Sequence, residues 1–139
     1  MRISAIIESR EGERRVALTP EAAQKLVSDG HTVTIESGAG AAIGALDNDY
    51  RDAGALIADN RAGAIAAADL VASINHGHVD DLPGLDERHT LVALLDPLWR
   101  PEPMTAIAAT GATALSLELV PRITRAQSMD VLSSMATVA

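Results

Sequence analysis

The sequence predicts an α/β fold: a doubly wound, mainly parallel sheet flanked by helices. Short apolar segments alternate with amphipathic ones along the chain, as they do where parallel strands are joined by helical crossovers. With one Trp, one Tyr and no Phe, the core must be aliphatic and alanine-rich, which suits helices packed on a sheet. The 139 residues contain no internal repeat or low-complexity linker, so residues 1–139 are expected to form one domain.

The first half of the chain carries the clearest signals. Residues 3–7 are expected to form a short buried strand, followed by a charged loop. A helix begins at Thr19 and Pro20, because Thr caps free amides and Pro at the first helical position loses no hydrogen bond. Gly30 ends that helix. Residues 32–36 alternate apolar and polar side chains, which predicts a half-buried strand.

The remaining segments continue the alternation. Helices are expected over 47–53, 61–67 and 104–109, strands over 55–58, 70–74, 90–95 and 112–117, and a polar loop over 75–88.

Composition excludes several classes of function. A net charge of −8 opposes sequence-independent nucleic-acid binding, which needs clustered cations. The chain has no cysteine, so no disulfide, thiolate metal site or cysteine nucleophile is available. The first apolar stretch is soon interrupted by Glu8 and Arg10, and no apolar run approaches the roughly 20 residues of a membrane span. We therefore expect a soluble, cytoplasmic chain without direct membrane insertion.

Two motifs suggest a ligand but favour a simpler interpretation. The glycines of residues 38–44 suggest a dinucleotide fingerprint, yet its sixth position is Ile43 and it follows the second predicted strand, so a turn is favoured. His76 and His78 are spaced to share a metal, but no cysteine or third histidine lies nearby in the sequence. A solvated loop is favoured there, and no metal site is expected.

Arg15 stands at the end of the charged loop, just before an apolar segment. Its guanidinium is suited to binding a carboxylate. A plain surface arginine explains the same pattern, and both interpretations stay open.

The last stretch, from residue 118 on, leaves the final strand and enters a helix that is expected from about residue 128 and has no stop signal before Ala139. Open α/β sheets bind ligands at the carboxyl ends of their strands, where each strand connects to the next helix. Arg122 offers five donors, Gln127 both a donor and an acceptor, and Asp130 and Ser133 share one helical face.

That set is suited to gripping an amide-bearing ring and a ribose. A second interpretation is equally good, because Thr124 and Gln127 have the spacing of a helix capping box and Asp130 favours a helix N-terminus. Composition and periodicity do not decide between the two.

The segments 13–20, 30–33 and 36–40 resemble the N-terminal domain shared by alanine dehydrogenases and proton-translocating nicotinamide nucleotide transhydrogenases. The resemblance covers essentially the whole chain. The long motif at 121–135 looks like the loop and helix of the transhydrogenase alpha subunit and not like an alanine dehydrogenase.

The resemblance implies a Rossmann-like lobe of a dimeric NAD(H)-binding component, which passes hydride to NADP(H) on a partner domain. Hydride transfer is coupled to proton translocation through a membrane component, so the subunit is peripheral to the inner membrane. Arg122, Gln127, Asp130 and Ser133 match the family positions that surround the nicotinamide. The first three are implied to orient the ring for transfer, which is catalysis by positioning.

The sequence also departs from its family. Alanine dehydrogenases hold pyruvate with an arginine, which Arg15 matches, and with a lysine and a histidine, where Asn75 and Asp96 stand here. The family's cofactor lobe and its glycine fingerprint are expected after Ala139, so the isolated chain is expected neither to bind NAD(H) tightly nor to turn over. An alanine dehydrogenase-like lobe that binds pyruvate and a non-catalytic interaction domain remain as alternatives.

Overall fold

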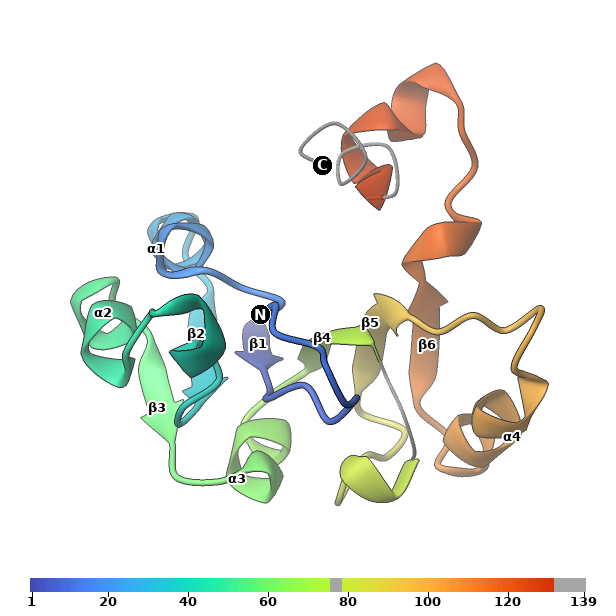
Figure 1. Ribbon diagram of the computed structural model, residues 1–139, viewed down its shortest axis with the longest axis horizontal. Helices are drawn as coiled ribbons and strands as arrows, with labels where there is room; N and C mark the ends of the chain where they lie inside the picture. The colour runs from blue at the N-terminus through green and yellow to red at the C-terminus, as the bar shows by residue number, and fades with distance from the viewer. Residues whose placement is uncertain (76–78, 132–139) are drawn as a thin grey trace.

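The computed structural model describes residues 1–75 and 79–131, which form one six-stranded parallel sheet with helices on both faces (Figure 1). This confirms the predicted fold class. The strands are β1 (Arg2–Ala5), β2 (Thr32–Glu36), β3 (Leu56–Ala58), β4 (Leu70–Asn75), β5 (Thr90–Leu94) and β6 (Thr113–Ser116), and they lie in the order β3-β2-β1-β4-β5-β6. The helices are α1 (Pro20–Ser28), α2 (Asp47–Asp52), α3 (Arg61–Ala66) and α4 (Pro101–Ala109), with 3-10 helices η1 (Ala41–Ile43), η2 (Val79–Asp81), η3 (Leu117–Leu119) and η4 (Thr124–Met129).

Helix α1 begins and ends as its sequence predicts. The Thr19 hydroxyl accepts a hydrogen bond from the Ala22 amide at 3.3 Å, and Pro20 occupies the first helical position. Gly30 follows the helix with φ of +86°, a conformation that glycine adopts without a steric penalty.

Helix α4, expected over 104–109, begins earlier, at Pro101. Proline there costs no helical hydrogen bond and has a φ suited to a first helical position.

Two apolar cores lie on opposite faces of the sheet. One core packs α1 and α2 against β1 and β2 through side chains such as Ala23, Tyr50 and Ile35. The other packs α3 and α4 against β4 and β5 through Ile65, Ile107 and Leu91. The helices appear in these pairs on the two sides of the sheet in Figure 1.

Strand β2 corrects one prediction. Its alternating sequence indicated a half-buried strand, but Thr34 and Glu36 are 6% and 7% exposed. Both α1 and α3 contact β2, so neither face of this strand meets solvent. The polar side chains are buried because sheets of this class are covered on both faces. Glu36 is paired there with Arg61 at 3.3 Å.

The predicted polar loop after β4 also contributes to the core. Its Leu82 and Leu85 are 2% and 6% exposed and belong to the apolar cluster of α3 and α4. A short 3-10 helix, η2, precedes them.

The far end of the sheet is less covered. Ala72, Val92 and Leu115 lie in register across β4, β5 and β6, on the face that α1 covers at β1. Leu115 is 51% exposed.

Within the described residues, no helix is both long and apolar enough to cross a membrane.

Candidate functional site

Glu8, just after β1, accepts hydrogen bonds from the last two backbone amides of β4, at 2.6 and 2.8 Å. The Ser73 hydroxyl donates to the same carboxylate at 3.1 Å. Strands β1 and β4 are neighbours at the point where the strand order reverses, which is where open α/β sheets commonly bind ligands. Burial raises the pKa of Glu8, although these hydrogen bonds act in the opposite direction. The carboxylate therefore satisfies backbone groups that a ligand would otherwise meet.

Arg15 reaches the same place. Its Nε and Nη2 donate to the two carboxylate oxygens of Glu13, at 2.7 and 2.5 Å. These hydrogen bonds hold the pKa of Glu13 at about 2, and the Asn75 side-chain amide donates to the same carboxylate. Arg15 thus binds a carboxylate, as its chemistry suggested, but this carboxylate is the side chain of Glu13 and not a ligand. We name Glu8, Glu13, Arg15 and Asn75 the switch-point cluster.

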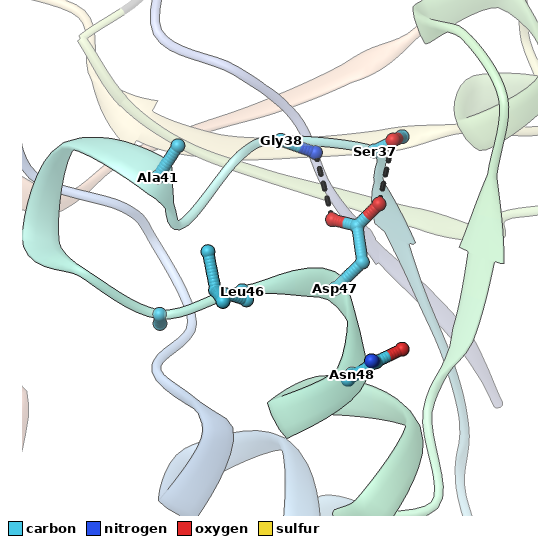
Figure 2. Close-up of a pocket in the computed structure, with 7 residues that line it drawn as sticks. Ser37, Gly38, Ala41, Leu46, Asp47 and Asn48 are labelled. Carbon is cyan, nitrogen blue, oxygen red and sulfur yellow. Dashed lines mark hydrogen bonds between the residues drawn. The ribbon is translucent and has the colours of Figure 1, made fainter.

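The glycine segment after β2 forms the turn that the sequence favoured. Asp47 accepts hydrogen bonds from the Ser37 hydroxyl at 2.6 Å and from the Gly38 amide at 2.8 Å, beside a pocket of about 330 Å³ (Figure 2). A Cβ at Gly40 would lie 2.7 Å from the Ala45 carbonyl oxygen and from the Tyr50 hydroxyl. Gly40 therefore serves close packing inside the turn.

The connector, residues 117–131, follows β6 and rises away from the sheet (Figure 1). It brings Arg122, Gln127 and Asp130 to one pocket of about 270 Å³, together with Ile123 and Thr124. Arg122 Nε lies 3.9 Å from Asp130 Oδ2, with the arginine side chain 71% exposed. Three of the four predicted site residues thus meet at one place, and Ser133 lies outside the described residues.

The connector differs from its predicted local structure. Thr124–Met129 is a 3-10 helix whose N-cap is Ile123, and no side chain caps it. Thr124 lies inside this helix, so the capping box inferred from Thr124 and Gln127 does not form. The helix expected from about residue 128 lies largely outside the described residues.

A second cavity, about 550 Å³ and largely apolar, separates the connector from the sheet. Its lining includes Leu119 and Met129 from the connector, Leu95 and Pro97 from the end of β5, and Leu115 from β6. We call it the β6 groove. Near its rim, Glu118 accepts hydrogen bonds from the backbone amides of Leu95, at 3.3 Å, and Asp96.

Sequence reasoning missed the carboxylates that cap strand ends, Glu8 and Glu118. A usable signal was present, since each is a charged residue that follows a short apolar strand by two or three positions. The histidines considered as metal ligands, His76 and His78, lie outside the described residues. Over residues 1–75 and 79–131, no group of three or more His, Asp or Glu side chains is placed to hold a metal.

Comparison with known proteins gives consistent matches. The family model for the alanine dehydrogenase/PNT N-terminal domain matches residues 5–139. The NAD(P) transhydrogenase subunit alpha of Cereibacter sphaeroides is 39% identical over all of this chain and 27% of its own length. The solved structure of a transhydrogenase from Sinorhizobium meliloti superposes with a TM-score of 0.91 at 37% identity, covering 99% of this chain and 41% of that one.

Alanine dehydrogenases are more distant. The Bacillus subtilis enzyme is 31% identical over 95% of this chain and 34% of its own length. The chain therefore spans between about a quarter and two fifths of the length of these relatives.

Proposed function

The chain belongs to the alanine dehydrogenase/PNT N-terminal domain family, and from this membership we propose that it is the first lobe of the NAD(H)-binding alpha subunit of an NAD(P) transhydrogenase. Its connector residues Arg122, Gln127 and Asp130, together with Ser133, orient the nicotinamide of NADH for hydride transfer to oxidised NADP. The observation that carries this proposal is the convergence of Arg122, Gln127 and Asp130 on one pocket.

The donors and acceptors of the pocket fit a nicotinamide and its ribose. A primary amide such as that of Gln127 pairs with a carboxamide through one donor and one acceptor, and the carboxylate of Asp130 accepts from a hydroxyl. Arg122 adds a fixed fork of donors at the mouth of the pocket. The reduced nicotinamide of NADH would supply the hydride, and the residues would contribute by holding its ring in one orientation.

The size of the pocket supports a shared site. Its volume of about 270 Å³ is below the roughly 300 to 1,000 Å³ of pockets that enclose a drug-sized ligand. A pocket of this size is suited to one ring rather than to a whole dinucleotide. The rest of NAD(H) is proposed to lie against a second lobe, in a longer polypeptide of the length that the relatives have.

The partners follow from the same proposal. The lobe acts within a homodimeric subunit at the inner membrane, together with an NADP(H)-binding component and a membrane component that couples hydride transfer to proton translocation.

The switch-point cluster favours this function over a pyruvate-binding dehydrogenase. The guanidinium of Arg15 is engaged by Glu13. Asn75 and Asp96 stand where the resemblance implies the lysine and histidine of alanine dehydrogenases. A neutral amide and a carboxylate do not supply the cation and the imidazole of such a site.

Steady-state hydride transfer from NADH to an NADP analogue tests the proposal, in the complete subunit combined with its NADP(H)-binding partner. We expect Arg122→Ala and Asp130→Asn to lower kcat by about 10- to 100-fold, because misplacing a reacting ring has effects of that order. Arg125→Ala is the matched control, since Arg125 is exposed on η4, between Arg122 and Asp130 in the sequence, but does not line the pocket. Unchanged transfer rates in the two pocket variants would refute the site.

A further inference from the structure

We propose that Glu118 is a positioning residue for the connector: its carboxylate ties the start of the connector to the end of β5 and so sets where Arg122, Gln127 and Asp130 lie. The catalytic consequence rests on the proposed function of that pocket, whereas the structural tie does not. Glu118 lies in η3, the first turn after β6, four residues before Arg122.

The two oxygens of Glu118 accept from two successive amides that directly follow the neighbouring strand β5. Oε2 accepts from Leu95, at 3.3 Å, and Oε1 accepts from Asp96. Leu95 is 4% exposed, so its amide has little access to water and needs a partner within the protein. An ionised acceptor makes stronger hydrogen bonds to backbone amides than a neutral one. Both oxygens thus bind Glu118 to the turn that follows β5.

The backbone of the turn that follows β5 has an unusual conformation. Asp96 has φ of +52°, the left-handed region, which no other non-glycine residue adopts in the described part of the chain. Such a conformation persists where the surroundings hold it. On one side the Asp96 amide meets Glu118, and on the other its carbonyl oxygen accepts from the amides of Trp99 and Arg100, at 3.2 and 2.9 Å. The turn after β5 is therefore shaped to present its amide to the carboxylate.

Beyond η3, the backbone hydrogen bonds that the described residues of the connector make are local. The Ile123 amide bonds the Pro121 carbonyl, and the Ala126 amide bonds the Ile123 carbonyl, both at 2.9 Å. Such bonds shape the connector but do not fix it to the sheet. Apolar contacts across the β6 groove add to the tie, but they are non-directional. The direction in which the chain leaves β6 thus depends on the hydrogen bonds of Glu118.

The test compares Glu118→Ala, which removes both acceptors, with Glu118→Gln, which keeps one, in the 139-residue chain. Glu102→Ala, an exposed glutamate in the first turn of α4, is the matched control. Amide hydrogen exchange reports on Leu95, Asp96 and residues 120–126. Limited trypsin digestion reports cleavage after Arg122 and Arg125, with cleavage after the loop residue Arg10 as the internal reference.

We expect connector exchange and cleavage to rise about tenfold in Glu118→Ala and less in Glu118→Gln, while amides of β1 and β2 and cleavage after Arg10 stay unchanged. Unchanged exchange and cleavage in the connector of Glu118→Ala would overturn the tie. If Glu118→Ala does not fold, Glu118→Gln decides, since one lost acceptor must still loosen the connector.

Hydride transfer in the complete subunit tests the catalytic consequence. We expect Glu118→Ala to lower kcat with little change in KM for NADH, and Glu118→Gln to restore part of the loss. If Arg122→Ala lowers kcat but Glu118→Ala does not, Glu118 is not a positioning residue. If Arg122→Ala itself has no effect, the proposed function fails, and hydrogen exchange alone then decides whether the tie exists.

Discussion

The switch-point cluster and the connector pocket place similar side chains at the same edge of the sheet, but in opposite states. Glu8 and Glu13 are bonded to backbone amides, to Arg15 and to Asn75. Arg122, in contrast, is 71% exposed, and its nearest carboxylate oxygen on Asp130 lies 3.9 Å away. The difference shows that position at the strand ends does not by itself make a binding site. Polar groups that satisfy one another stabilise the fold, whereas the exposed guanidinium of Arg122, at the edge of a pocket, is accessible to a ligand.

The largest expected effect is on the switch-point cluster. Glu8→Ala should lower the free energy of unfolding by about 2 to 3 kcal/mol, because two amides of β4 and the Ser73 hydroxyl lose their acceptor. Urea denaturation at pH 7 measures the change. Glu11→Ala, an exposed glutamate in the adjoining loop, should change stability by less than about 0.5 kcal/mol. Equal effects of the two variants would remove the contrast between the regions.

The free energy of unfolding should fall at low pH because of Glu13, a member of the switch-point cluster. Its pKa is about 2 in the fold against an ordinary value of 4.5, chiefly because Arg15 hydrogen-bonds its charged form. The stability from this shift is therefore complete above pH 4.5 and is lost as the pH falls toward 2. Because Arg15 is partly exposed, we expect a loss of only about 1 to 2 kcal/mol.

Urea denaturation at several pH values between 6 and 2 measures this loss against Glu13→Gln, which should lack it. The pKa of Glu8 is raised, so its protonation favours the folded state. Glu8 therefore adds nothing to the loss of stability in acid. Parallel pH profiles for the wild type and Glu13→Gln would contradict the assignment to Glu13.

The smallest effect on stability is expected in the connector. Arg122→Ala should shift the free energy of unfolding by less than about 0.5 kcal/mol, since exposed ion pairs contribute little. Thermal and urea denaturation of the isolated chain provide the measurement. A loss above 1 kcal/mol would mean that Arg122 stabilises the fold, which would weaken the case that its charge is held available for a ligand.

Local patterns in the sequence predicted what depends on local structure. The Thr19 cap and the short apolar strands each arise from residues that are close in sequence. The members of the connector pocket are also close in sequence, between residues 122 and 130, but the family resemblance singled them out, since local patterns left two interpretations open. The acceptor role of Glu8 was not predictable in this way. Its partners lie 66 and 67 residues further on, and only the strand order brings them together.

The errors have physical causes as well. The alternation in β2 resembles that of a strand with one solvent-exposed face. Glu36 can nevertheless be buried, because Arg61 forms an ion pair with its carboxylate and the Ile7 amide donates a hydrogen bond to it. The spacing of Thr124 and Gln127 resembles a capping box, yet Thr124 lies inside the 3-10 helix Thr124–Met129 and no side chain caps that helix. Burial and capping both depend on neighbours that a single-sequence pattern does not contain.

The strand order β3-β2-β1-β4-β5-β6 also bears on how the chain folds during synthesis. Strands β1 to β3 are made before any residue of β4 emerges, so β1, which lies between β2 and β4 in the finished sheet, has no partner on one side until β4 has been made. Unpaired strand edges invite association between nascent chains. Arg2 begins this strand, and Glu8 follows it by three residues. Charges at both ends of an open edge oppose such association until β4 arrives to complete the sheet.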